Sequence, residues 1–382
     1  MKSRGRAKSK GRGRTGLKFP HTRVRWQRFA LVAGATFLIA NPLSAAAQSP
    51  TATPGVVDLA GLKTYMVDHA AKMEAGTAEV LTFAQSYYDE AKAEKFDYQK
   101  LWDAQGTALQ KDLEHARDVW SNDAHGNYEL NEGMVAGIPS LAYFDELIDA
   151  GPSAADDPTG ALDFTIELPD GTKLVKPGNL FHYVTERQLW GTEDEWVGLK
   201  VDFNGDGKFE LGEALPNANA LLGSVQALDH ATAKLGTAIA GWQPNLDDAF
   251  TALVVMIPTM DGYFNEWKLS PFVLGDKSTQ KGLVARSRLI DVLGILSGLD
   301  LTYNTVSPLI TAQSAAIESQ IRTELDGLIG FVQNLSDKEA AGTRYTPDQA
   351  DQFGSELQAR ASSLAGQISQ AAGLVGAAIA SS

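Results

Sequence analysis

The strongest constraint on the fold is a helical repeat of mainly apolar side chains that begins after Asp58. Its members recur every three or four residues, a spacing that places them on one face of an α-helix. They are Leu62, Met66, His69, Met73, Thr77, Val80, Ala84 and Tyr87. Further helices are predicted over about 97–120, 131–149, 217–242, 246–267, 278–303, 306–334 and from 346 to near the C-terminus. The chain is therefore expected to be all-α.

Residues 151–216 break the helical pattern. The stretch FTIELPDGTKLV alternates polar and apolar residues around Asp170-Gly171, which predicts a β-hairpin. A short helix is expected near 178–190, with an acidic loop after it. The predicted domains are a first helical bundle over 58–150, an insert over 151–216 and a second helical bundle over 217–382.

Two segments in the middle of helical stretches resemble each other. Residues 138–146 read IPSLAYFDE, and residues 257–266 read IPTMDGYFNE, with a gap of one residue. An ancient duplication of one bundle would explain this similarity. Chance similarity is the alternative.

The first 47 residues have the features of a secretory signal peptide. They hold eleven Lys and Arg and no acidic residue, with an apolar run from Phe29 to Ala40 and small residues before Gln48. We expect cleavage near Ala47-Gln48, followed by a linker over 48–57. The apolar run is too short to span a membrane comfortably. There is no cysteine, which excludes a lipoprotein and disulfides. These features predict a periplasmic or secreted protein with no membrane span after cleavage.

Removal of this basic segment leaves a strongly acidic chain. The remaining 22 Lys and Arg face 47 Asp and Glu, a net charge of −25. Such a chain repels nucleic acid and favours cations as partners, although the ordinary solubility of an exported protein accounts for much of the charge.

Residues 202–213, DFNGDGKFELGE, fit the calcium-loop pattern of an EF-hand. Calcium needs six to eight oxygen ligands, and Gly207 would supply the sharp turn. The predicted ligands are the side chains of Asp202, Asn204 and Asp206, the Lys208 carbonyl, Glu210 directly or through water, and both oxygens of Glu213. An acidic Gly-rich turn without calcium is the alternative.

This loop is expected to stand alone, because Pro216 would soon interrupt an exiting helix. Isolated extracellular calcium loops are usually structural sites of weak affinity. The hypothesis is that calcium braces the neighbouring segment that carries His182 and Glu186.

A second metal site is suggested by histidines and carboxylates elsewhere in the chain. The sequence contains no HExxH, no G-x-S-x-G, no P-loop and no cysteine nucleophile, so metal binding suits it better than covalent catalysis. On a helix, His182 and Glu186 would share a face and could hold one ion, or form a surface pair. Further candidates upstream are His125, Tyr128, Glu129, Glu132, Tyr143 and Asp145.

The segment from Trp120 to Asp149, ending in YFDELID, resembles the imelysin-like proteins and the related periplasmic component of Efe-type iron uptake. The hallmark of that family is G-x-H-x-x-E followed by Leu-Trp. Its equivalent here is Gly178, His182, Glu186 and Leu189-Trp190. The resemblance implies two four-helix bundles and a metal site near Glu129, Asp145, His182 and Glu186. In this chain three residues separate His182 from Glu186 instead of two, which leaves the geometry of that site open.

Three functions are compatible with these features. The leading hypothesis is an exported, imelysin-like protein of bacterial iron uptake that binds iron or zinc and presents it to a membrane iron permease or another uptake component. A metallopeptidase is less well supported, because no residue is clearly a general base distinct from the metal ligands; we therefore expect no enzymatic activity. The third is a calcium-stabilised extracellular binding or scaffold protein.

Overall fold

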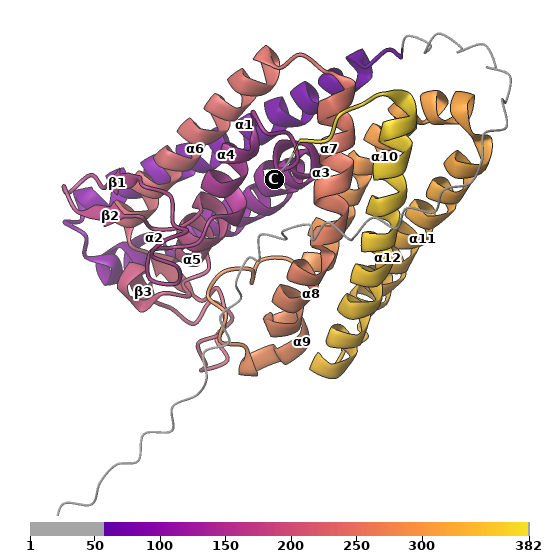
Figure 1. Ribbon diagram of the computed structural model, residues 1–382. Helices are drawn as coiled ribbons and strands as arrows, with labels where there is room; N and C mark the ends of the chain where they lie inside the picture. Colours follow the sequence, from indigo (N-terminus) through magenta and orange to yellow (C-terminus); the bar gives the residue numbers. More distant parts are fainter. Residues whose placement is uncertain (1–56, 381–382) are drawn as a thin grey trace, which may run out of the picture. The chain divides into compact units, whose positions relative to one another are not determined.

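The computed structural model describes residues 57–380, which are mainly helical (Figure 1). The all-α fold class is therefore confirmed. The predicted signal peptide and residues 48–56 of the predicted linker lie outside the described residues. The longer helices are α1 (Ala60–Ala93), α2 (Tyr98–Val119), α3 (Gly126–Val135), α6 (Ala218–Gly241), α7 (Leu246–Met256), α8 (Met260–Leu269), α10 (Arg288–Gln313), α11 (Ala315–Ala340) and α12 (Pro347–Val375).

The first bundle is built around α1, which packs against α2, α3 and α6. The predicted stripe of α1 is buried, with the exception of His69. Thr77, the polar member of the stripe, forms a 2.9 Å hydrogen bond with Thr232 of α6, so its hydroxyl is satisfied between the two helices. Figure 1 shows α6 running beside α1.

This packing differs from the domain boundary expected at residue 217. The helix that follows the insert, α6, has a nearly continuous apolar face that includes Leu221, Leu228 and Leu235, and it lies along α1. The first bundle is therefore completed by a helix from beyond the insert. The second bundle consists of α7, α8, α10, α11 and α12, with α12 against α8 and α10 against α11.

Helix α10 forms the core of this second bundle and also packs against α3. Within residues 57–380 it is the helix that is long and apolar enough to cross a membrane, but 56% of its most apolar window is buried inside the protein. The helix break expected between 303 and 306 is wrong, since α10 continues through Pro308 to Gln313. Its start is also later than predicted, because Ser287 accepts a hydrogen bond from the Leu289 amide and caps the helix there.

The insert contains short elements. As predicted, β1 (Thr165–Glu167) and β2 (Lys173–Val175) form an antiparallel hairpin, with Ile166 opposite Leu174. A second pair, β3 (Val197–Lys200) and β4 (Ala214–Pro216), brings together the two ends of the acidic loop. The short α- and 3₁₀-helices of the described residues, of which α5 and η4 lie in the insert, are α4 (Ala142–Asp145), α5 (Glu186–Leu189), α9 (Pro271–Leu274), η4 (Asp194–Trp196), η5 (Ile257–Thr259) and η6 (Gly275–Lys277).

Candidate metal centre

Four buried side chains converge between the first bundle and the insert. They are His125, Glu129, Asp149 and His182, and one nitrogen or oxygen atom of each lies within 4.8 Å of the others. Glu129 is on α3, four residues after His125. The other three lie on π-helical turns: His125 on η1 (Trp120–His125), Asp149 on η2 (Glu146–Ala150) and His182 on η3 (Leu180–Thr185).

The π-helical turns explain how the unusual spacing of His182 and Glu186 is accommodated. A π turn closes a hydrogen bond across five residues, one more than an α turn, and such turns are frequent at functional sites. Asn179 begins η3 by accepting hydrogen bonds from the His182 amide at 2.7 Å and the Tyr183 amide at 3.3 Å. Across the three intervening residues, His182 Nδ1 still lies 2.7 Å from Glu186 Oε2.

The four side chains make close contacts through the atoms that a metal would use. His125 Nε2 lies 2.8 Å from Glu129 Oε1 and 3.2 Å from Asp149 Oδ1. His182 Nε2 lies 3.0 Å from Asp149 Oδ1. The indole of Trp120 stacks on the His125 ring, with a 5.2 Å centroid separation and an 11° interplanar angle. The imidazole is thereby held on one side while its Nε2 faces the carboxylates.

Several of these buried atoms have no hydrogen-bonding partner of good geometry among the described residues. They are both carboxylate oxygens of Glu129, Oδ2 of Asp149, Nδ1 of His125 and Nε2 of His182. A buried polar atom without a partner costs about 1–3 kcal/mol. The donor set of two imidazoles and two carboxylates fits a transition-metal ion, which would satisfy the atoms that face the centre of the cluster.

The structure brings together two of the four residues expected at this site, Glu129 and His182. Asp145 lies outside the cluster, and its Oδ1 accepts a 2.7 Å hydrogen bond from the Tyr128 hydroxyl. Glu186 also lies outside it. Asp149 and His125 complete the cluster instead. The sequence could not distinguish Asp149 from Asp145 as a ligand, because the two are four residues apart and would lie on the same face of a helix.

Glu186 is buried, and its carboxylate accepts four hydrogen bonds from N–H donors. Its Oε2 accepts hydrogen bonds from His182 Nδ1 and from the Leu283 amide, and its Oε1 accepts from the Val284 and Ala285 amides, all at 2.7 Å. A carboxylate in this position fixes the imidazole tautomer and turns Nε2 toward the cluster. Glu186 therefore orients His182 and ties it to the segment before α10.

Burial and neighbouring charges shift the pKa values of the four side chains in the cluster. Burial lowers the pKa of His182, but Asp149 and Glu186 outweigh it and raise that pKa to about 10. Burial also lowers the pKa of His125. For Asp149, burial opposes ionisation, yet His182, His125 and Arg288 hold the pKa well below its usual range. Burial and the charges of Asp291 and Asp149 raise the pKa of Glu129 well above its usual range.

A buried arginine from α10 closes the site on the side of the second bundle. Arg288 Nη1 lies 3.8 Å from Glu129 Oε1, and Nη2 lies 3.9 Å from Asp149 Oδ2. Its guanidinium lies over the Tyr263 ring, 4.8 Å from the centroid. The Tyr263 hydroxyl in turn donates to Glu132. Residues of both bundles therefore surround the cluster.

The acidic loop over 202–213 is held by its own backbone amides. Asp202 accepts from the Gly205 amide at 2.6 Å and the Gly207 amide at 2.7 Å, and the Asn204 side chain accepts from the Asp206 amide at 2.9 Å. Asp206 accepts from the Lys208 amide at 2.8 Å. The Glu213 carboxylate accepts from the amides of Phe203 at 3.1 Å and Glu210 at 2.9 Å. The side-chain oxygens proposed for calcium thus lie along one closed loop.

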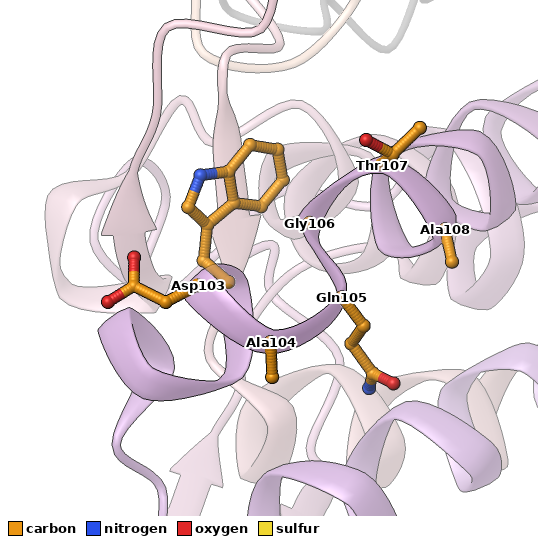
Figure 2. A pocket seen from close by; sticks show the side chains of 7 residues that line it. Asp103, Ala104, Gln105, Gly106, Thr107 and Ala108 are labelled. Carbon is orange, nitrogen blue, oxygen red and sulfur yellow. The ribbon is translucent and has the colours of Figure 1, made fainter.

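A surface hollow of about 540 Å³ lies at a break in α2, where Gln105 leaves helical geometry with φ −149° and ψ 25°. Figure 2 shows the side chains of Asp103, Gln105 and Thr107 pointing in different directions around it. Among its lining residues, 102–108, Asp103 is the single ionisable one, so the hollow does not gather a set of metal-ligating side chains.

Fold and site together define a class of helical-bundle proteins with a buried cluster of imidazoles and carboxylates. The sequence model of the imelysin (peptidase M75) family matches residues 69–371. The chain therefore belongs to the imelysin family, as the resemblance predicted. Comparison with curated proteins gave no match.

Proposed function

We propose that this protein binds a transition-metal ion, iron or zinc, through His125, Glu129, Asp149 and His182, and that it serves bacterial iron uptake. The observation that carries the proposal is the convergence of two imidazoles and two carboxylates that are all buried, with candidate ligand atoms within 4.8 Å of one another and several polar atoms lacking a hydrogen-bonding partner of good geometry. Membership of the imelysin family supports a role related to iron uptake. In this proposal the protein is exported to the periplasm or beyond and passes the ion to a membrane permease or another uptake component.

The geometry favours binding over peptide hydrolysis, although the family carries a peptidase name. A metallopeptidase needs a metal-bound water, an open coordination position and a general base. Here the four candidate ligands are buried, and both oxygens of Glu186 are engaged by His182 and three backbone amides. Hydrolysis of casein that is abolished by a chelator and by Glu186→Gln would support the peptidase alternative instead.

The test is a competition titration of the purified protein with Zn²⁺ and Fe²⁺ against a chromogenic chelator. The wild type is expected to bind one ion, and Asp149→Asn and His182→Ala each to lower the affinity by about 100-fold or more, because each removes a ligand. His115→Ala is the matched control, since this exposed histidine pairs with Glu79 away from the cluster. Absence of binding by the wild type, or unchanged binding by His182→Ala, would refute the proposal.

We also propose that the acidic loop binds calcium and braces the segment carrying His182 and Glu186. Arg117 of α2 supports a mechanical link, because it donates 2.7 Å hydrogen bonds to the Gly212 carbonyl of the loop and to the Leu189 carbonyl of α5. In addition, the Gly212 amide donates to the Trp190 carbonyl at 3.1 Å. A calcium-stabilised binding or scaffold protein without a transition metal would share these features.

Calcium binding is tested by thermal melting with calcium and with a calcium chelator. Calcium should raise the melting temperature of the wild type through mass action, and Glu213→Gln should abolish most of that increase. Asp170→Asn, in the neighbouring hairpin turn, is the control. An equal melting temperature of the wild type with and without calcium would count against the proposal that calcium braces this segment.

A further inference from the structure

Trp120 contacts both of the π-helical turns that carry the candidate imidazole ligands, and its indole is a hydrogen-bond donor that offers no ligand atom. We propose that Trp120 is a positioning residue, which holds His125 by ring stacking and fixes the turn of His182 through a hydrogen bond to Thr185. This inference rests on the proposed metal-binding function and deepens it, because it names what sets the two imidazoles at the separation that one ion requires.

His125 lacks the kind of partner that orients His182. Nδ1 of His182 is bonded to Glu186, whereas Nδ1 of His125 has no hydrogen-bonding partner among the described residues. Metal-binding histidines usually donate this second N–H group to a partner that fixes the ring. For His125, aromatic contacts take that place: the Trp120 indole stacks on it at 5.2 Å and 11°, and the Phe181 ring meets it edge-on at 4.9 Å and 77°. The orientation of the His125 ring therefore depends on the indole.

The π-helical turn is what brings the indole over the imidazole. Trp120 is the first residue of η1 and His125 is the last, five positions later. A π turn closes across five residues, whereas neighbours on one face of an α-helix are three or four residues apart. The stacking of these two rings is thus a direct product of the π-helical geometry of η1.

The N–H edge of the same indole is tied to the turn of His182. Trp120 Nε1 donates a 2.8 Å hydrogen bond to Thr185 Oγ1, and both side chains are buried. The Thr185 hydroxyl in turn donates to the Leu180 carbonyl at 2.8 Å. Leu180 and Thr185 are the first and last residues of η3, so this hydroxyl closes the turn that presents His182. The indole N–H group therefore fixes where η3 lies relative to η1.

The test is a double-mutant cycle on the full chain, with Zn²⁺ affinity measured by competition titration. Trp120→Phe keeps an aromatic ring beside His125 and removes the N–H group, while Thr185→Val keeps the shape of the side chain and removes the hydroxyl. Each change breaks the same link, so each should lower the affinity by about tenfold or more, and the double variant should lose little beyond the larger single loss. Losses that multiply in the double variant would show two independent effects and overturn the inference.

A second readout separates positioning from a general loss of stability. The visible absorption spectrum of bound Co²⁺ depends on the geometry of its ligands, so displaced imidazoles should change this spectrum in Trp120→Phe. The matched control is Trp267→Phe, because Trp267 is equally buried and its indole donates at 2.8 Å to Glu339 in the second bundle. This control should lose resistance to urea but keep the Zn²⁺ affinity and the Co²⁺ spectrum of the wild type.

Variants of Thr185 keep the test decisive if Trp120→Phe does not fold. Thr185→Ser retains the hydroxyl and should keep most of the Zn²⁺ affinity, whereas Thr185→Val should not. Equal affinities of these two variants, or wild-type affinity and spectrum in Trp120→Phe, would overturn this inference alone. Failure of the wild type to bind Zn²⁺ would overturn the proposed function itself.

Discussion

At the scale of single residues, the carboxylate of Glu186 lies next to the candidate metal ligands but is directed at other groups. Four hydrogen bonds at 2.7 Å surround it, and each donor is an N–H group. An amide side chain in its place would bring an NH₂ group against the backbone N–H groups of 283–285. We expect Glu186→Gln to weaken metal binding by about 10- to 100-fold, because the orienting partner of His182 is lost.

Asp145→Asn is the control for this prediction, measured in the same competition titration. Its side chain can still accept the hydrogen bond from Tyr128, so metal affinity should stay near that of the wild type. If Asp145→Asn lost binding and Glu186→Gln did not, Glu186 would have no orienting role.

The protonation of His182 predicts a pH dependence. Its pKa in the metal-free fold is raised from 6.5 to about 10, so its interactions stabilise that fold below about pH 6.5 and this contribution is lost as the pH rises through about 10. A metal ion must displace this proton. Metal affinity should therefore increase by about tenfold per pH unit for each proton released between about pH 7 and 9. Titrations at three pH values measure the slope, and a flat profile would contradict the assignment.

At the scale of elements, the segment 278–287 covers the site as it leads into α10. Gly282 packs so closely on η3 that a Cβ atom there would lie 2.4 Å from the His182 carbonyl oxygen. The next residue, Leu283, has a left-handed φ of 61° and directs its amide to Glu186. Backbone geometry in this segment thus depends on close approach to the π-helical turn that carries His182.

Gly282→Ala should therefore displace the segment from η3. We expect a loss of about 1–3 kcal/mol in the free energy of unfolding, measured with urea, together with weaker metal binding. Gly262→Ala is the control, because a Cβ at this position in α8 meets nothing within 4 Å. It should stabilise the helix by about 0.5–1 kcal/mol. Equal stability of Gly282→Ala and the wild type would show that the segment adapts without cost.

At the scale of the whole molecule, the site lies where the two bundles meet. The cluster belongs to α3 and to the π-helical turns around it, while Arg288 and Tyr263 reach it from the second bundle. Helix α10 also packs against α3. Binding of an ion should therefore stabilise both bundles together.

A metal at 100 times its dissociation constant should stabilise the folded protein by about 2.7 kcal/mol. The expected result is a higher melting temperature with Zn²⁺ and no such shift for Asp149→Asn, measured by calorimetry. A wild-type melting temperature that changes with neither Zn²⁺ nor a chelator would contradict this coupling.

Much of the fold follows from local patterns. The three- to four-residue repeat predicts α1 with its buried stripe, and the alternation around Asp170-Gly171 predicts the hairpin. Helical spacing paired His182 with Glu186, and the upstream stretch offered His125 and Glu129 as further candidates. The family resemblance then placed Glu129 and His182 in one site. Neither the position of α6 nor the continuation of α10 past Pro308 follows from such patterns, since both depend on packing between segments distant in sequence.

By itself, the sequence determined which residue types are available for a metal, because the imidazoles and carboxylates can be read from it directly. Only the tertiary structure decided which of them meet. Asp145 and Asp149 are one helical turn apart and chemically alike, yet the π-helical turn and the neighbouring helices bring only Asp149 to the imidazoles. Likewise, Glu186 is excluded from the cluster because the amides of 283–285, from the segment before α10, occupy its oxygens. These hydrogen bonds join residues that are 97 to 99 positions apart in the chain, so local spacing cannot predict them. They are the reason that Glu186 orients His182 and is not itself a candidate ligand.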